Sequence, residues 1–264
     1  MSKQDSLVEY WKQYRSVNDS PRHLLALFQG VVKMLIRRDY NVGPLAPLLN
    51  HDPTNNDHAN AFAKYIAGNV TSGDRLTPVQ RILLEDKRDS LRAMLSMVFP
   101  HNKDQNDHCL VFFADVTEGD HILVAETAMF STLVQFTRAK VGILISNAPI
   151  QAISKFVEAE TPGENFLQHF LDDELLYDPT ECVYGSDTRI LSGVETVSLL
   201  TENSLKLNQL AKIMTIDPVG KYLGIRPGQI AEHDRENILP ESLIDREYFY
   251  RCGYNRVQER KSKK

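Results

Sequence analysis

Residues 216–230 read IDPVGKYLGIRPGQI, and this stretch decides the fold of the C-terminal part of the chain. Asp217 is a good helix N-cap because its carboxylate can accept hydrogen bonds from the first backbone N–H groups, and Pro218 suits the next position. Gly224 stands where the end of a helix favours a positive φ. Residues 226–228, Arg-Pro-Gly, are typical of a tight turn, and the run that follows is typical of a strand. The stretch therefore predicts a short capped helix, a turn and a strand, and none of its residue types at this spacing performs chemistry.

Length and composition indicate a folded protein of one large or two ordinary domains. The chain has 264 residues, of which 42% are hydrophobic and 25% charged. No apolar run approaches the roughly 18 residues that a membrane helix needs, and residues 1–5 show no hydrophobic signal segment. The cysteines, Cys109, Cys182 and Cys252, lie far apart without a Cys-x-x-Cys pair, which favours a reducing compartment and disfavours structural zinc. We expect no membrane association, no metal site and no cofactor.

The charge balance excludes a protein that binds nucleic acid through overall basicity. The formal net charge is −5, whereas affinity for nucleic acid depends on basic patches. Any DNA contact must therefore be local or shared with a larger assembly. The candidates are Arg22, Lys33, Arg37 and Arg38 in one predicted helix, for which a solvated helix face is the alternative. A basic tail at residues 256–264 suits a localisation signal, a nucleic-acid arm or a solubilising end.

Residue patterns predict an α/β domain over residues 1–160. A strand pattern at 109–116, a helical pattern over 127–140 and a continuous apolar run at 141–146 together suggest a βαβ unit. The other elements expected in this part are helices over 6–17, 20–39, 76–98 and 149–159, a strand over 121–125 and a polar loop over 43–60.

The sequence Thr-Pro-Gly-Glu at 161–164 is the best boundary between domains. Beyond it, Ser192 opens a capping box before a further helix, and residues 246–253 form the expected last strand. We therefore expect a second domain over 161–255 and a disordered tail after it.

Matches that occur in order along the chain identify a family resemblance. The family's pattern is an Asp-Pro-Val, an aromatic-aliphatic-Gly, a further Gly and a strand ending in Arg; here these are residues 217–219, residues 222–224, Gly228 and Arg235. Upstream, residues 207–213 sit where the family has a similar Asn-Gln-Leu run, and downstream Tyr250-Arg251 matches its terminal pair. The chain resembles the family of the fifth-largest subunit shared by nuclear RNA polymerases, which includes its archaeal counterpart.

The resemblance implies a two-part, non-catalytic subunit of a DNA-directed RNA polymerase in the nucleus. The N-terminal part would be an α/β jaw domain with a nuclease-like three-layer fold near downstream DNA. The C-terminal part would be a small α+β assembly domain that packs on the largest polymerase subunit. The positions carried over from the family are Leu210, Asp217, Pro218, Val219, Tyr222, Gly224, Gly228, Arg235, Tyr250 and Arg251. All of them except Val219 are predicted partner contacts, and most would also shape the assembly domain. Of these, Arg235 and Arg251 are the strongest contact candidates, because a guanidinium is a rigid bidentate donor.

The chain also departs from the family pattern. Ala211 stands where the family has Pro, Gly220 where it has Ala, and residues 236–246 form a longer loop than the family's short hairpin. Such divergence fits a distant eukaryotic lineage, a viral copy or a duplicated gene dedicated to one polymerase. A copy dedicated to polymerase I would place the chain in the nucleolus, and a viral copy would place it in a viral factory or virion.

Two other functions stay open at the level of sequence. A metal-dependent nuclease would take a carboxylate from Asp115 or Asp120, but residues 121–125 contain no Glu-x-Lys, and the triplet at 85–87 lies in a helical pattern. Residues 172–174, Asp-Asp-Glu, are expected to form a solvated charged edge and not an acid–base pair. The other alternative is an adaptor that binds a polymerase only transiently.

Overall fold

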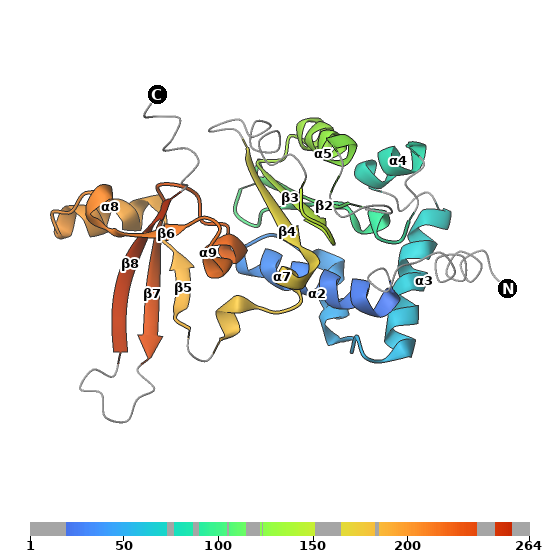
Figure 1. Cartoon of the computed structure of the whole chain (residues 1–264), viewed down its shortest axis with the longest axis horizontal. Helices are drawn as coiled ribbons and strands as arrows, with labels where there is room; N and C mark the ends of the chain where they lie inside the picture. Colours follow the sequence, from blue (N-terminus) through green and yellow to red (C-terminus); the bar gives the residue numbers. More distant parts are fainter. Residues whose placement is uncertain are drawn as a thin grey trace. The chain divides into compact units, whose positions relative to one another are not determined.

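The computed structural model describes residues 20–72, 77–86, 90–104, 106–114, 122, 124–150, 165–182, 185–236 and 246–254. The chain divides into two compact units, residues 1–177 and 178–264, each with its own sheet (Figure 1). The helix predicted over 6–17, most of the helix predicted over 149–159, and the basic tail lie outside the described residues.

Helix α2 (Pro21–Arg37) begins the first unit where the sequence predicts it. The Ser20 side chain accepts a hydrogen bond from the His23 N–H at 3.3 Å, and Pro21 fills the first turn. Its apolar stripe, which includes Leu24 and Phe28, is fully buried. The helix therefore supplies one wall of the core of this unit.

The sheet of the first unit has the order β1-β2-β3-β4. Its strands are β1 (Met97–Pro100), β2 (His108–Phe113), β3 (Val141–Ser146) and β4 (Phe166–Leu171). β1 is antiparallel to β2, whereas β2, β3 and β4 are parallel to one another. Helix α5 (Val124–Thr137) connects β2 with β3, so the predicted βαβ unit is confirmed.

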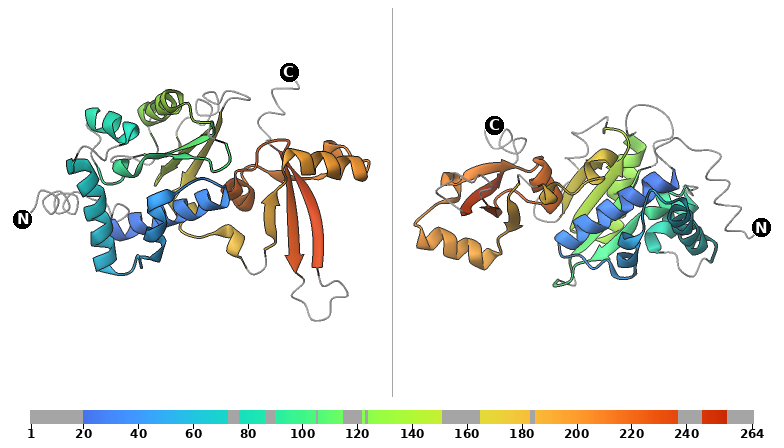
Figure 2. Two further views of the ribbon diagram at one scale, coloured as in Figure 1. Left: turned by 180° about the vertical axis from the view of Figure 1, so that it is seen from behind. Right: turned by 90° about the horizontal axis from the view of Figure 1, so that it is seen from below.

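Helices cover both faces of this sheet. Successive strand residues point to opposite faces. The Phe112 ring meets Phe130 of α5 at 6.0 Å, and the next ring, Phe113, meets Phe28 of α2 at 6.2 Å. Every residue of β3 is accordingly buried, and α2 lies over the strands in Figure 2. The first unit is thus a three-layer α/β domain.

Several predicted boundaries in this unit are wrong. The loop expected over 43–60 contains a 3-10 helix, η2 (Gly43–Asn50), and the start of α3 (Asn56–Ser72). Asn55 caps α3 by accepting a hydrogen bond from the Asp57 N–H at 2.8 Å, so a polar stretch becomes a helix start.

The helix expected over 76–98 and the strand expected over 121–125 are also corrected. Helix α4 (Pro78–Glu85) starts at a Thr77 capping box but stops after eight residues, and a short 3-10 turn, η3 (Ala93–Leu95), leads into β1. Ile122 makes only an isolated bridge to Ile150, because α5 already begins at Val124.

The first unit extends beyond the expected boundary at residue 160. β4 pairs with β3 along its whole length, and the short helix α7 (Asp172–Leu175) follows it directly. The division therefore falls after Tyr177.

The second unit is a small α+β domain. Its sheet has the order β5-β7-β8-β6, formed by β5 (Asp187–Ile190), β7 (Ile230–Glu236), β8 (Arg246–Tyr254) and β6 (Ala211–Met214). β6 runs parallel to β8, and the other pairs are antiparallel.

Its helical segments are η4 (Pro179–Glu181), α8 (Gly193–Glu202), η5 (Leu207–Gln209) and α9 (Pro218–Leu223). A small core of Ile213, Leu223, Ile225 and Ala231 lies between α9 and the sheet. Among the helices within the described ranges, none has both the length and the apolarity that crossing a bilayer requires.

Candidate functional site

Helix α9 has the caps that the sequence predicts. One Asp217 carboxylate oxygen accepts hydrogen bonds from the N–H groups of Val219 at 3.1 Å and Gly220 at 3.2 Å. Gly224 ends the helix with φ +75°, and Gly228 in the following turn has φ +87°. These backbone conformations favour glycine, so both residues act through the fold of the motif.

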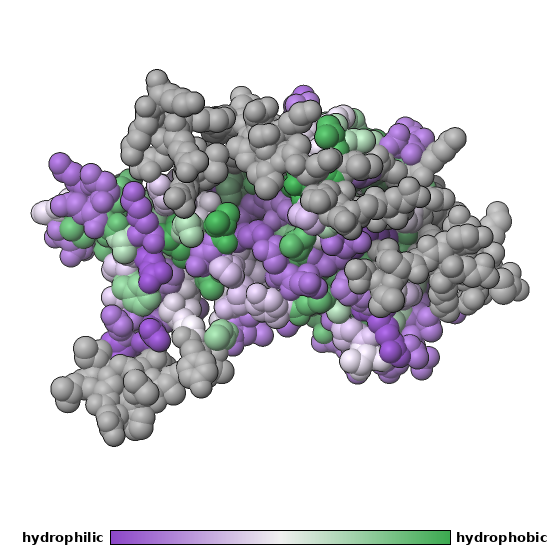
Figure 3. Space-filling view, in the orientation of Figure 1, coloured by the Kyte–Doolittle hydropathy of each residue, from purple (hydrophilic) through white to green (hydrophobic). Residues whose placement is uncertain are grey.

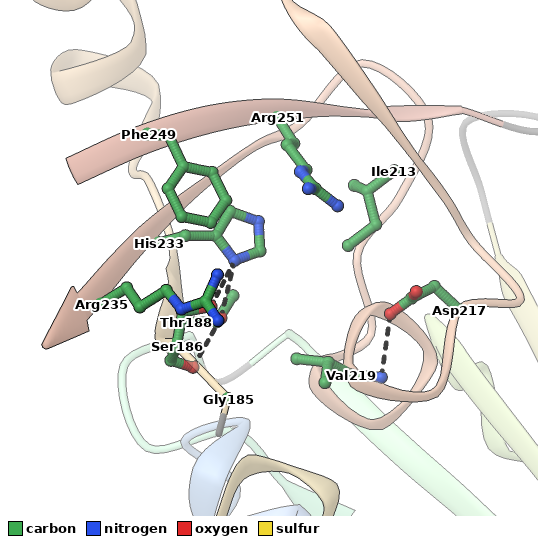
Figure 4. A pocket seen from close by; sticks show the side chains of 10 residues that line it. All are labelled: Gly185, Ser186, Thr188, Ile213, Asp217, Val219, His233, Arg235, Phe249 and Arg251. Atoms are coloured by element: carbon green, nitrogen blue, oxygen red, sulfur yellow. Dashed lines mark hydrogen bonds between the residues drawn. The ribbon is translucent and has the colours of Figure 1, made fainter. Parts of the chain in front are cut away.

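A pocket of about 250 Å³ opens beside α9, and Figure 4 shows the ten residues that line it. The sequence-predicted residues Asp217, Val219, Arg235 and Arg251 are among them. Residues at alternate positions of β7 and β8 face the same side of the sheet, which brings the two arginines to one wall.

His233 is the central group of this pocket, and the sequence analysis missed it. Its side chain is 4% exposed and stacks on Phe249, with ring centroids 4.7 Å apart and planes tilted by 8°. Its Nδ1 atom shares hydrogen bonds with the hydroxyls of Thr188 at 2.9 Å and Ser186 at 3.1 Å. His233 lies two residues before Arg235, so the two side chains face the same side of the strand. This spacing is the signal that would have identified His233 once the strand was recognised.

The electrostatic surroundings keep His233 neutral. Burial lowers the pKa of its imidazole, the Arg251 guanidinium lowers it further, and the Asp217 carboxylate opposes both effects. The pocket can therefore offer a neutral ring together with two permanent positive charges.

The other predicted contact residues are spread over the second unit. Tyr222 is buried in α9, and Leu210 is half-buried just before β6. Tyr250 points to the face of the sheet opposite the pocket, where its hydroxyl donates to Glu232 at 3.1 Å. The structure thus unites four of the ten predicted positions in one pocket and leaves the rest in the scaffold or on the other face.

A second feature of this unit is an exposed apolar surface on α8. The helix has a Ser192 capping box, as the sequence predicts, yet none of its residues is buried. Val194 is 79% exposed and Val197 is 64% exposed. Hydrophobic residues reach the surface in this part of the molecule, at the left of Figure 3. Val194 and Val197 are three residues apart in the helix and form a small exposed apolar surface.

The basic residues of α2 divide into two sets. Arg22, Lys33 and Arg37 are exposed, and their spacing of eleven and four residues places them on one helix face. Arg38 lies just past the helix, and its guanidinium stands over the Phe170 ring at 5.9 Å. Only the first three form a basic face.

Asp172 corrects the expectation of a solvated acidic edge. Its side chain is buried and receives two hydrogen bonds from Arg92, at 2.9 and 2.6 Å, with His23 Nε2 at 3.4 Å. Burial raises the pKa of this carboxyl, but the hydrogen bonds from His23 and Arg92 outweigh burial and hold the pKa below its usual value. Asp172 is therefore a structural ion-pair partner within the first unit.

Within the described ranges, no three His, Cys, Asp or Glu side chains converge to hold a metal ion. His51 and His58 stack at 5.1 Å, and His58 accepts a hydrogen bond from the Asp52 N–H. The two nuclease candidates, Asp115 and Asp120, lie outside the described residues.

Comparison with known proteins relates the second unit to one family. Residues 177–252 match the family described as RNA polymerase Rpb5, C-terminal domain. The chain is 27% identical to proteins named DNA-directed RNA polymerases I, II, and III subunit RPABC1 from Caenorhabditis briggsae and Caenorhabditis elegans, over 53% of its length. A protein of that name from Dictyostelium discoideum is 27% identical over 53% of the chain and 71% of its own length. The matches span 65% of each nematode protein, which is just under two thirds of their length.

Proposed function

Because the chain is a divergent member of the Rpb5 family, we propose that it is a non-catalytic subunit of a multisubunit DNA-directed RNA polymerase. The observation that carries the proposal is the coincidence of the family match, residues 177–252, with a compact unit of the chain that contains the complete α9 motif. Nuclear transcription is the corresponding process, and the polymerase chemistry would belong to other subunits.

The second unit would serve as the assembly domain. An isolated ten-residue helix is marginal in water, and packing usually stabilises such helices through an apolar face. Val194 and Val197 of α8 face solvent, so a partner subunit that covers them would supply this packing. We assign that role to the largest polymerase subunit, with Arg235 and Arg251 as a second contact area.

The first unit would serve as the jaw near downstream duplex DNA, with nuclease-like three-layer architecture. The exposed face of Arg22, Lys33 and Arg37 supports this role, since basic side chains in a row can follow phosphates. A net charge of −5 makes DNA contact by the chain alone weak, so the contact would form only in the assembled enzyme.

A variant of the α8 surface tests the assembly role. A tagged chain carrying Val194→Asp and Val197→Asp is purified from its own cells beside wild type and an Asn208→Asp control at an exposed position outside α8. We expect wild type and the control to recover the largest polymerase subunit and the double variant to lose it, with circular dichroism unchanged. Equal recovery by all three would remove α8 from the interface, and no recovery by wild type would remove the polymerase assignment.

A further inference from the structure

The pocket beside α9 contains a buried polar atom that lacks a partner. Among the described residues, none forms a hydrogen bond with His233 Nε2, although the side chain is 4% exposed. Figure 4 shows this nitrogen on the side of the ring away from Thr188 and Ser186, facing the interior of the pocket. A buried ring nitrogen without a partner is costly, which points to a group that enters the pocket.

Among the residues that line the pocket, positive charges outnumber negative charges by one. Arg235 and Arg251 contribute two positive charges, and Asp217 contributes one negative charge. Within the described part of the chain, no carboxylate pairs with either arginine, even though Glu247 stands opposite Arg235 in the ladder. Arg251 faces Ala231 and Ala211 across the strands and has no carboxylate opposite it, so its end of the pocket is complementary to a negatively charged group.

Two carboxylates of β7, those of Glu232 and Asp234, are occupied on the opposite face of the sheet. Glu232 accepts from Arg189 at 2.5 Å, and Asp234 pairs with Arg246. Side-chain alternation separates these pairs from the pocket face, so they cannot neutralise Arg251.

The remaining wall of the pocket is apolar. Ile213, Val219 and Phe249 line it, and the Arg251 guanidinium lies 5.3 Å from the Phe249 ring centroid. Such a wall suits a short hydrocarbon stem, while a guanidinium binds a carboxylate through two parallel hydrogen bonds. A free dianion would be repelled by the Asp217 carboxylate and would make no favourable contact with the apolar wall.

We infer that this pocket is a receptor for one glutamate side chain of a protein partner. The glutamate carboxylate binds Arg251 and accepts a hydrogen bond from Nε2–H of the His233 tautomer in which Nδ1 accepts from a neighbouring hydroxyl. Its two methylene groups lie against Ile213 and Val219. The inference deepens the proposed assembly role and rests on it for the identity of the partner as a polymerase subunit.

The test is a titration of the full-length chain carrying isotope-labelled histidine, followed by nuclear magnetic resonance. The probes are N-acetylglutamate N-methylamide, the matching glutamine compound, and inorganic phosphate. Loss of one ring signal in a His233→Gln variant assigns the reporter. We expect a saturable shift of the His233 signal with the glutamate probe in the millimolar range and no saturation with the glutamine compound.

Two arginine variants of strand β8 make the test specific. Arg251→Gln is expected to weaken binding of the glutamate probe about tenfold or more, because it removes a charge-assisted hydrogen bond. Arg246→Gln removes the same charge from the opposite face and is expected to leave binding unchanged. Circular dichroism of both variants checks that the fold is retained.

Three outcomes would overturn the inference: no saturable shift with the glutamate probe, equal binding of the glutamine compound, or tighter binding of phosphate. The titration contains no polymerase, so its result is independent of the proposed function. If the chain binds the probe but recovers no polymerase, the pocket inference stands and the assignment as a polymerase subunit fails. If the chain recovers polymerase but does not bind the probe, only the pocket inference fails.

Discussion

Arg92 and Asp172 form a buried ion pair across 80 residues of sequence, with two hydrogen bonds of 2.9 and 2.6 Å between guanidinium and carboxylate. The Arg92 side chain is 1% exposed, and its Nε–H also donates to the Ala114 carbonyl oxygen at 2.6 Å. One side chain thus joins the segment before β1, the end of β2 and the start of α7. The pair holds the carboxyl end of the parallel sheet in the first unit.

Arg92→Met is expected to destabilise the first unit by about 3–5 kcal/mol, because it leaves the buried Asp172 carboxylate without its main partner. Urea unfolding measures the change. Lys103→Met, which breaks an exposed pair with Asp39, is the control and is expected to change little. Similar effects of the two substitutions would contradict the structural role of Arg92.

Acidification is expected to destabilise the second unit through His233. The pKa of this imidazole is lowered from 6.5 in the folded chain, so the unfolded chain binds a proton first as pH falls. This contribution to stability is present above pH 6.5 and is lost as pH falls from there through the folded pKa. A His233→Leu variant is expected to lose less stability than wild type between neutral and mildly acidic pH. Parallel stability curves for the two chains would exclude His233 as the cause.

Gly224→Val is expected to weaken the second unit by about 1 kcal/mol or more, because a β-branched residue is strained at a positive φ. The residue has φ +75°, and thermal unfolding measures the loss. Gly193→Ala is the control, since an added Cβ there meets nothing within 4 Å. Unchanged stability and unchanged recovery of polymerase would show that α9 can end at a residue other than glycine.

Arg235→Ala is expected to reduce recovery of the polymerase while the fold is retained, because the side chain is exposed on the pocket face. Affinity purification gives the recovery, and circular dichroism gives the fold. Unfolding of the second unit would instead show that the guanidinium is structural.

Local signals predicted the parts of the fold whose causes are local. The Ser20-Pro21 start of α2, the buried run of β3 and the caps of α9 depend on neighbours within a few residues, and the structure confirms each of them. Strand β1 was missed because four residues carry too little periodicity and follow a genuine helix start at Thr77.

The site was predictable only in part, because its geometry depends on register. Arg235 and Arg251 were found through the family pattern, but their shared face becomes apparent only when β7 and β8 are paired. His233 carries no local signal, and its partner Thr188 lies 45 residues away. Burial of Asp172 likewise depends on Arg92, which no spacing rule connects to it.

The most direct test of the central claim is the number of copies of this chain per polymerase. A tagged chain is purified mildly from its own cells, and quantitative mass spectrometry compares it with the largest polymerase subunit recovered. We predict one copy of the chain for each largest subunit. Substoichiometric polymerase would indicate a transient adaptor, and recovery of the chain alone would contradict the assignment as a polymerase subunit.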